Sequence, residues 1–387
     1  NLLDIPACAD LFCALGHQVA GEAPPLHKPR YHFDYPGSTH GFTHRNNGKG
    51  RIISITNYEL QITNYDVDDR RSVVGGQRSV SGLQVSVRKL GKKGEVRLYV
   101  KTAYRPAELS ANYYGASFSA KIAPGQQMRA RLYLPPDAPE QLLAALYVWD
   151  DNSGQSYQNV GHPLQPGQWH ELSYQIPVLH NACLTEAGLV FRNLGQPWTG
   201  SIVLDYLDWD GTPRYSSDFS KERPEYGAIS QWTTLRGYWR LEGGAYHGSG
   251  PGVNESYSGD IEWRDHTLTV RLVPLLGDYH NINLRVQGAL RSYAVGLAPG
   301  QKLTLYKNAG GYQAVASADF PWRHHRPYTL SLTAEENHLT VKVDGETKLE
   351  WCDQEIPYLH GQIGLSNFAA CHTRYESVEI EPVHKER

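Results

Sequence analysis

The stretch SIVLDYLDWDGTP, residues 201–213, has the pattern of a β-strand that ends in a turn. At the two-residue period of a strand, side chains alternate between the two faces of a sheet. An Asp-Gly pair and a proline then stop the strand. One run of short β segments ends here and another runs from Tyr226 to Pro382, so the stretch predicts the last strand of one β-sandwich and the start of a bridge to a second. One face of this strand would carry Val203, Asp205, Leu207 and Trp209, and the other Leu204, Tyr206, Asp208 and Asp210.

Composition narrows the classes of partner. The 387 residues suffice for two to three domains of roughly 150 residues each. A formal net charge of −3 gives no basic nucleic-acid footprint, and no apolar run approaches the ~20 residues that span a bilayer, so neither nucleic acid nor membrane is expected as a partner. The 25 tyrosines and 9 tryptophans outnumber the 8 phenylalanines, which suits stacking on polar ring-shaped ligands, although all-β proteins also use tyrosine in their strands.

Turn residues recur at intervals of roughly ten along most of the chain and separate segments of alternating hydrophobicity. This pattern is typical of antiparallel sandwiches. We therefore predict an all-β fold of two antiparallel β-sandwiches, a jelly roll and a concanavalin-like one, preceded by a short helical segment. The expected divisions are a helical segment and Pro/Gly-rich linker at 1–50, the first sandwich at 51–213, a bridge at 214–227, the second sandwich at 228–383 and a tail at 384–387.

The first sandwich carries the segments PGQQMRARLYLPPD, LYVWDDNSG, LQPGQWHELSYQIP and LDYLDWDG between residues 124 and 211. Together they resemble the carbohydrate-binding jelly rolls of the galactose-binding-like group, over residues 110–211. The resemblance implies that aromatic side chains on one rim or face stack on sugars. The candidates are Trp149, Tyr157 and Trp198, while Trp169 and Trp209 are expected to pack inside.

The second run carries GYWRLE at 237–242, the expected strand pair DIEW and TLTVRLVP, GQIGL at 361–365 and a final ESVEIEP. These features resemble the concanavalin-like, laminin-G-type sandwiches that are attached to glycan-degrading enzymes. The segment GDYHNINLRVQGALRSYAVG is dense in hydrogen-bond donors and aromatic rings. Its residues either line a ligand site or are ordinary strand residues in cross-strand pairs. The ligand-binding candidates of this sandwich are Tyr246, Tyr279, His280, Arg285, Arg291 and Tyr293.

A catalytic alternative rests on three carboxylates in GDIEWRD. Asp260 and Glu262 would share a face of a strand, and a bulge would bring Asp265 to the same face. Glycoside hydrolysis needs two carboxylates roughly 5 to 9 Å apart, one as acid and one as nucleophile or base. The order Asp, Glu, Asp differs from the Glu, Asp, Glu of the retaining glucanases that share this fold, which favours a binding module over a glycoside hydrolase. A structural or assembly tail is the third class.

Two groups of residues are candidates for ion binding or acid–base chemistry. Asp205, Asp208 and Asp210 would contribute to a structural calcium site, which also needs oxygens from other loops. The group His32, Asp34 and His40 matches no metal-binding spacing, so a structural role is expected there. Cys352 and Cys371 are either a cross-strand pair or free thiols.

Residues 3–20 have the apolar spacing of a short helix, and a Pro-rich link leads from them to HFDYPGSTHGF at 32–42. This arrangement resembles the end of the helical catalytic domain in long bacterial ADP-ribosylglycohydrolase-like proteins. The resemblance implies an attached or associated helical catalytic domain and a bacterial protein, cytoplasmic or secreted. The acidic metal-binding motifs of that family have no counterpart here, so no catalytic residue carries over. The predicted function is non-catalytic binding of a glycan or another sugar-containing ligand within a larger glycoside-processing protein.

Overall fold

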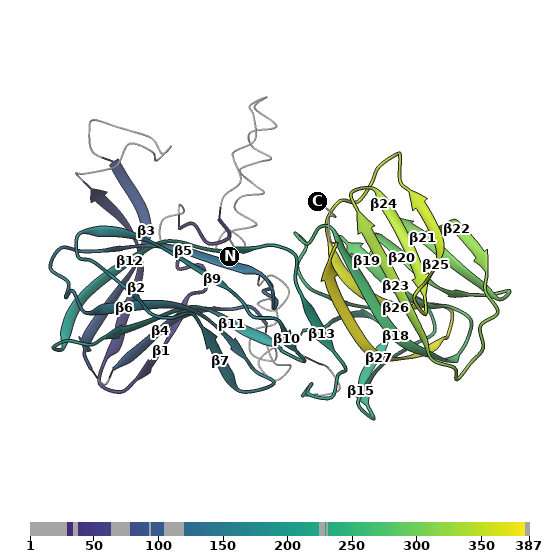
Figure 1. Cartoon of the computed structure of the whole chain (residues 1–387), viewed down its shortest axis with the longest axis horizontal. Helices are drawn as coiled ribbons and strands as arrows, with labels where there is room; N and C mark the ends of the chain where they lie inside the picture. Colours follow the sequence, from purple (N-terminus) through teal and green to yellow (C-terminus); the bar gives the residue numbers. More distant parts are fainter. Residues whose placement is uncertain are drawn as a thin grey trace.

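The computed structural model of the protein describes residues 29–33, 38–62, 78–92, 94–103, 120–223, 229 and 231–383. All regular secondary structure within these ranges is β-strand. Figure 1 shows two β-sandwiches side by side along the long axis of the molecule. The all-β prediction is therefore confirmed, whereas the expected helix at 3–20 and the tail at 384–387 lie outside the described residues. No helix in the described part of the chain is long and apolar enough to cross a membrane.

The first sandwich packs two antiparallel sheets around one hydrophobic core, to which both sheets contribute alternate residues. One sheet has the order β1-β4-β11-β6-β7, with β8 beside β6: β1 (Thr43–Asn47), β4 (Glu95–Lys101), β6 (Leu142–Asp150), β7 (Gln155–Gln158), β8 (His162–Pro163) and β11 (Leu184–Asn193). The other has the order β2-β3-β12-β5-β9: β2 (Arg51–Ile62), β3 (Arg78–Leu90), β5 (Gln127–Leu134), β9 (Gln168–Gln175) and β12 (Trp198–Asp210).

Strand β12 lies at the centre of its sheet, and a β-bulge divides it into two halves. Its pairing with β5 passes from Leu204–Leu132 to Tyr206–Arg131 and skips Asp205. A bulge inserts one residue and so reverses which face the following residues occupy. Before the bulge Ile202 and Leu204 face the core, and after it Leu207 and Trp209 do. The prediction that Val203 shares a face with Leu207 and Trp209 is therefore wrong.

The segment before residue 51 contributes to the first sandwich. Tyr31, Phe33 and Phe42 are buried in its core, and Tyr31 exchanges two backbone hydrogen bonds with Leu207 at 3.1 and 3.0 Å. Strand β1 also precedes residue 51 and pairs with β4. All five residues of β1, THRNN, are polar and exposed. Hydrophobic alternation therefore cannot reveal this strand.

The second sandwich also encloses one core between two sheets. One sheet has the order β14-β17-β26-β19-β20-β21-β22: β14 (Thr233–Arg236), β17 (Asn254–Ser258), β19 (His280–Val286), β20 (Arg291–Ala298), β21 (Lys302–Ala309), β22 (Tyr312–Asp319) and β26 (Gln362–Asn367). The other has the order β10-β13-β27-β18-β23-β24-β25, with β16 beside β27 and β15 beside β16: β10 (Leu179–His180), β13 (Tyr215–Ser217), β15 (Tyr238–Glu242), β16 (Ala245–Ser249), β18 (His266–Leu276), β23 (Tyr328–Glu335), β24 (His338–Val343), β25 (Glu346–Cys352) and β27 (His372–Pro382).

Local turn chemistry closes the hairpins of this sandwich. The turn between β24 and β25 places Asp344 and Gly345 at φ +49° and +88°. Two consecutive positive φ values define the turn that best fits strand twist, and Asp-Gly accepts them at low cost. A second hairpin, with its turn at 308–311, joins β21 and β22.

A short strand from the expected bridge ties the two sandwiches together. Strand β13 pairs with β27 of the second sandwich and, in parallel, with β10, which follows β9 of the first. Beside it, the Arg30 guanidinium donates to the Trp209 carbonyl oxygen at 3.0 Å and to the Asp260 carboxylate at 3.1 Å. Residues 215–217 are therefore part of a continuous sheet.

Candidate functional site

Aromatic and charged side chains gather on the outer face of the β1-β4-β11-β6-β7 sheet. In β4 the residues Val96, Leu98 and Val100 point into the core, so Arg97 and Tyr99 point outward. The same alternation places the outward side chains of three neighbouring strands beside them. We name this surface the aromatic–arginine face; it consists of Arg45, Arg97, Tyr99, Tyr147, Trp149 and Glu186.

Arg45 starts on the edge strand β1 and reaches across the sheet. Its guanidinium carbon lies 5.4 Å from the ring centroid of Tyr99 and 5.7 Å from that of Trp149. Its Nη2 lies 2.7 Å from Oε1 of Glu186, whose side chain is buried. Cation–π contacts and a charge-assisted hydrogen bond thus hold one guanidinium over two aromatic rings.

A second arginine covers the third aromatic ring. The guanidinium carbon of Arg97 lies 5.0 Å from the ring centroid of Tyr147. The Tyr147 hydroxyl donates to Oε2 of Glu186 at 3.3 Å. Burial, with the Glu186 charge beside it, raises the pKa of Tyr147 well above its usual value, so the phenol stays a hydrogen-bond donor.

A glycine gives the face its shape. Gly188 lies opposite Tyr99 on one side and Tyr147 on the other. A Cβ at position 188 would come within 2.0 Å of the Leu98 carbonyl oxygen and 2.8 Å of the Tyr99 Cβ. Only glycine allows this close approach, and its missing side chain lowers the surface between the aromatic rings.

An open hollow of about 360 Å³ lies beside Arg45, Arg97 and Trp149 of this face. This volume is within the range of small-ligand sites. The Trp149 side chain is partly buried against its neighbours on the face and partly exposed, so a ligand can contact part of the indole. Guanidinium donors, amide groups, a carboxylate and one indole border the hollow, a set that can stack on a ring and hydrogen-bond its substituents: Arg45, Asn46, Asn47, Glu95, Arg97 and Trp149.

The other candidates of the first sandwich lie elsewhere. Tyr157 and Trp198 are half-buried and pack against the core of the first sandwich. They therefore point inward and share no surface with Trp149, which lies on an outer face. Trp209 is buried as predicted, but the expectation for Trp169 is wrong. Trp169 lies on the outer face of the other sheet, where the Arg131 guanidinium carbon is 4.5 Å from its ring centroid.

Four of the six candidates of the second sandwich are buried. Tyr246 packs in the core between Trp239 and Phe219. The Tyr293 hydroxyl donates to Asp353 at 2.6 Å and accepts from the Tyr358 amide at 2.9 Å. Their hydroxyl and ring surfaces are therefore occupied by the protein.

His280 and Arg285 are buried on the same strand, β19. The His280 ring nitrogens lie 2.7 Å from the Thr373 hydroxyl and 2.8 Å from the Gly277 carbonyl oxygen, and burial lowers the pKa of His280 to about 4. Arg285 donates to the carbonyl oxygens of Tyr358, at 2.6 Å, and Glu336, and pairs with Asp265 at 2.8 Å. Both side chains fasten loops to the sheet.

The remaining two candidates reach solvent at opposite ends of β19. Tyr279 precedes the strand, and its ring centroid lies 5.7 Å from that of Phe368. Arg291 is exposed beyond the other end, over the ring of Tyr358 at 4.8 Å. The structure does not bring these two residues to one site.

The three carboxylates of the catalytic alternative do not share a face. Residues 260–265 form a turn before β18, so the predicted DIEW strand is absent. Asp260 is buried and pairs with Arg30, whereas Glu262 is exposed. Asp265 pairs with Arg285 and accepts from the Glu336 amide. Each carboxylate thus serves a different local contact.

Each of the proposed calcium ligands lies near an arginine side chain: Asp205 near Arg131 at 3.4 Å, Asp208 near Arg30 at 3.9 Å and Asp210 near Arg129 at 2.7 Å. Across the described residues, no group of three or more histidine, cysteine, aspartate or glutamate side chains is placed to hold a metal ion.

His32 and His40 are buried with their ring centroids 6.4 Å apart, and Asp34 lies outside the described residues. His40 also packs edge-on against Phe33, with ring centroids 5.3 Å apart. Cys352 and Cys371 are free thiols, as one of the two alternatives expected. These residues therefore add nothing to the aromatic–arginine face.

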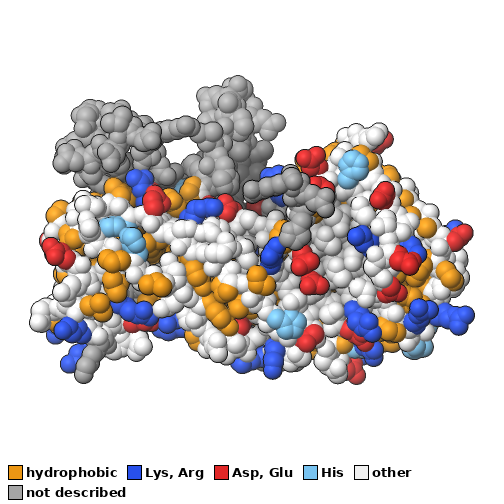
Figure 2. Space-filling view, viewed as in Figure 1, with side chains coloured by type: hydrophobic (Ala, Val, Ile, Leu, Met, Phe, Trp, Pro, Cys, Tyr) orange, Lys and Arg blue, Asp and Glu red, His pale blue; other side chains and the backbone are white. Residues whose placement is uncertain are grey.

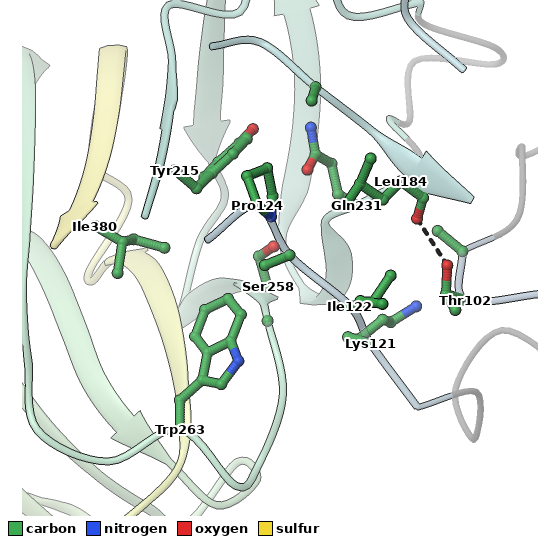
Figure 3. Close-up of a pocket in the computed structure, with 14 residues that line it drawn as sticks. Thr102, Lys121, Ile122, Pro124, Leu184, Tyr215, Gln231, Ser258, Trp263 and Ile380 are labelled. Carbon is green, nitrogen blue, oxygen red and sulfur yellow. Dashed lines mark hydrogen bonds between the residues drawn. The ribbon is translucent and has the colours of Figure 1, made fainter. Parts of the chain in front are cut away.

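A second cavity lies where the two sandwiches meet (Figure 3). Lys121 and Ile122 enter from the first sandwich, and Trp263 and Ile380 from the second. The cavity measures about 30 Å³, which accommodates about one water molecule and no sugar ring. Burial lowers the pKa of the Lys121 ammonium here.

Sequence reasoning found one residue of the aromatic–arginine face, Trp149, and missed the rest. The alternation in EVRLYVK puts Arg97 and Tyr99 on one side of a strand. Tyr147 and Trp149 have the same two-residue spacing in LLAALYVWD, so the two segments together indicate an aromatic surface on the outer face of the sheet. Strand pairing supplies the contacts of Arg45 and Glu186, and no local sequence feature specifies them.

No protein-family model and no curated protein matches this sequence. The solved structures that match part of the chain include a carbohydrate-binding module, galectin-like proteins and glucanases. The carbohydrate-binding module CBM66 from Bacillus subtilis is 20% identical, covers 39% of this chain and 95% of its own, and gives a TM-score of 0.36. A protein of unknown function with a galectin-like fold, also from Bacillus subtilis, is 16% identical over 39% of this chain and 89% of its own, with a TM-score of 0.33.

A prokaryotic β-1,3-1,4-glucanase (lichenase) derived from a mouse hindgut metagenome is 13% identical. The match covers 44% of this chain and 99% of the glucanase, with a TM-score of 0.35. Each of these matches is a partial likeness, and none of them assigns a role to a residue of this chain.

Proposed function

We propose that this chain binds glycans through the aromatic–arginine face of its first sandwich. The observation that carries the proposal is the hollow that Trp149 borders together with Arg45, Arg97 and asparagine side chains. One face of a sugar ring presents C–H groups that pack on an indole, while its hydroxyls need donors and acceptors around the edge. The hollow supplies both kinds of surface within one sheet.

The contacts beneath the hollow support a binding role because they fix its walls before a ligand arrives. Glu186 is buried and engages both Arg45 and Tyr147, so the two sides of the face share one anchor. Side chains held in place by such contacts lose little entropy on binding. A preorganised surface of this kind favours recognition of a ligand.

A glycan array probed with the intact chain tests this proposal, and Trp169 provides the matched control. Trp149 and Trp169 are both half-buried tryptophans beneath an arginine, on outer faces of opposite sheets. Trp149→Ala should weaken binding to every hit about 30-fold, the loss expected for a buried aromatic anchor, while Trp169→Ala binds like the wild type. Equal losses in the two variants, or no glycan bound at all, would contradict the proposal.

We also propose that the chain is a non-catalytic part of a larger glycoside-processing protein with an attached or associated helical catalytic domain. Incubation of each array hit with the chain should leave the glycan intact. An antiserum against the chain should detect a natural protein well above 43.4 kDa. Hydrolysis abolished by Glu262→Gln would favour the enzyme alternative, and repetition of the array after chelation tests the structural calcium.

A further inference from the structure

We propose that the glycan bound at the aromatic–arginine face carries an anionic group, the carboxylate of a uronic acid or a sulfate ester. This inference rests on the proposed function and narrows its ligand class. It follows from the charges on the face, from the arginine donors that the protein leaves unused and from the way in which the two guanidinium groups are held.

The face has an excess of positive charge in a chain whose net charge is negative. Strand register puts three arginines, Arg45, Arg97 and Arg192, on the outer face of this sheet, against the carboxylates of Glu95 and Glu186. Figure 2 shows basic and acidic side chains interspersed on the side of the molecule that Figure 1 displays.

The two carboxylates leave the arginines only partly neutralised. Glu95 serves two arginines at once: its Oε1 accepts from Nε of Arg97 at 2.8 Å and its Oε2 from Nη2 of Arg192 at 2.6 Å. Glu186 accepts from Arg45 through one oxygen and from Tyr147 through the other. A further carboxylate or sulfate at this surface would reduce the excess of positive charge.

Arg45 and Arg97 also retain donors that can reach such a group. A guanidinium has five N–H bonds in a planar fork. Among the described residues Arg45 uses Nη2 for Glu186, and Arg97 uses Nε for Glu95. The Arg45 side chain is 47% exposed, and both arginines border the hollow. The remaining N–H groups match the two oxygens of a carboxylate.

Cation–π contacts help to hold each guanidinium in place. Arg45 lies over Tyr99 and Trp149, and Arg97 lies over Tyr147. A sugar that packs against the exposed part of Trp149 therefore has a positioned guanidinium at its edge. This geometry favours a ring that bears its charge on a substituent, as in a uronic acid or a sulfated sugar.

The experiment compares three matched oligosaccharides by isothermal titration calorimetry, at low salt and at 0.5 M NaCl. The higher concentration is about five times the ionic strength at which the Debye length is about 10 Å, so it screens interactions between exposed charges. They are an oligouronate, the same chain after its carboxyl groups are reduced to alcohols, and the neutral chain after sulfation. We expect the oligouronate or the sulfated chain to bind at least about 10-fold more tightly than the reduced chain, with the preference lost in high salt. The better of the two identifies the source of the negative charge.

Variants assign this preference to the face. Arg45→Gln should remove the preference for the anionic ligand, whereas Arg271→Gln should not. Arg271 is a matched control, since it is a similarly exposed arginine paired with a glutamate, Glu376, on the second sandwich. Arg45→Gln should therefore weaken binding of the anionic chain by a larger factor than binding of the reduced chain, and a circular dichroism spectrum checks the fold.

Two results would overturn the inference, and they are distinguishable. Equal affinity for the anionic and reduced chains, with both weakened by Trp149→Ala, would refute the anionic ligand and leave glycan binding at this face intact. Absence of binding to all three, or binding unaffected by Trp149→Ala, would refute the proposed function and the inference together.

Discussion

The outer faces of the two sandwiches use the same residue types to opposite effect. On the second sandwich, Glu255 accepts from Arg236 at 2.7 Å and from the Tyr312 hydroxyl at 2.8 Å, and Tyr312 in turn accepts from Asn283 at 2.9 Å. Phe368 packs on Tyr312 with ring centroids 4.6 Å apart, and Glu255 and Asn283 are fully buried. On the first sandwich, the arginines lie over aromatic rings and border an open hollow.

On the proposed function, arginine and tyrosine side chains serve binding where part of their hydrogen-bonding capacity stays open to a ligand. Around Glu255 and Tyr312 of the second sandwich, the described contacts use much of that capacity within the protein. The candidates of the second sandwich are accordingly expected to matter for stability, and those of the aromatic–arginine face for ligand affinity.

The largest expected effect concerns Arg285. Its replacement in Arg285→Met removes donors from two backbone carbonyl groups and the partner of Asp265, all inside the second sandwich. Breaking a buried pair in this way costs about 3 to 5 kcal/mol of unfolding free energy. Urea denaturation followed by tryptophan fluorescence measures the loss. If Arg285→Met were as stable as the wild type but no longer bound glycan, Arg285 would be a ligand-binding residue. The proposed difference between the two sandwiches would then be wrong.

Acid should destabilise the second sandwich through His280. Because burial lowers the pKa of His280 from 6.5 to about 4, the unfolded chain takes up a proton at a pH where the folded chain does not. The stability from the neutral imidazole is complete above about pH 6.5 and is lost as the pH falls toward about 4, by about 3 kcal/mol in total.

The variant His280→Gln isolates this contribution. Its unfolding free energy should fall less steeply than that of the wild type between about pH 6.5 and about pH 4, although it starts lower because two hydrogen bonds are disturbed. His266 is also buried with its pKa lowered to about 4, so part of the acid sensitivity remains. Parallel stability curves for the two proteins would show that His280 titrates normally in the fold.

A smaller effect is expected in Tyr147→Phe, which deletes the hydrogen bond to Glu186 and keeps the ring beneath Arg97. The expected loss is about 1 kcal/mol of unfolding free energy, together with a few-fold loss of glycan affinity, because Glu186 is held less firmly. Tyr206→Phe is the matched control, since its hydroxyl bonds Glu171 at 2.7 Å on an exposed part of the other sheet. A larger loss of unfolding free energy in Tyr206→Phe would mean that burial does not determine how much such a hydrogen bond contributes to stability.

The smallest effect is expected in Arg291→Ala. Arg291 is exposed, and its described side-chain contact is the one over the Tyr358 ring. Loss of an exposed cation–π contact costs about 0.5 to 1 kcal/mol, and glycan affinity should not change. Calorimetric titration of Arg291→Ala with an array hit checks this, and a large loss of affinity would place a ligand on the second sandwich.

The sequence predicted the architecture because alternation and turn chemistry are local signals. The strands of GLQVSVRKL, EVRLYVK and LLAALYVWD and the Asp344-Gly345 hairpin all follow from neighbouring residues. The bulge at Asp205 does not, because it depends on how β12 pairs with β5. Strand β1 escapes notice because it is polar.

The site was harder to predict, since burial of polar groups is decided across strands. Tyr293 and His280 are residue types that often bind ligands. In the folded chain, however, they form hydrogen bonds with Asp353 and Thr373, which are distant in sequence. Arg45 contributes to the aromatic–arginine face through Glu186, 141 residues away. Such contacts exist only in the folded chain.

Hydrogen–deuterium exchange of the intact chain, with and without its best glycan, tests most directly whether the first sandwich holds the ligand. We predict slower exchange on binding in β1, β4 and β6, the strands that carry Arg45, Arg97 and Trp149, and unchanged exchange in β19 and β20. Protection confined to β19 and β20, with none in β1, β4 and β6, would contradict this account and place the site on the second sandwich.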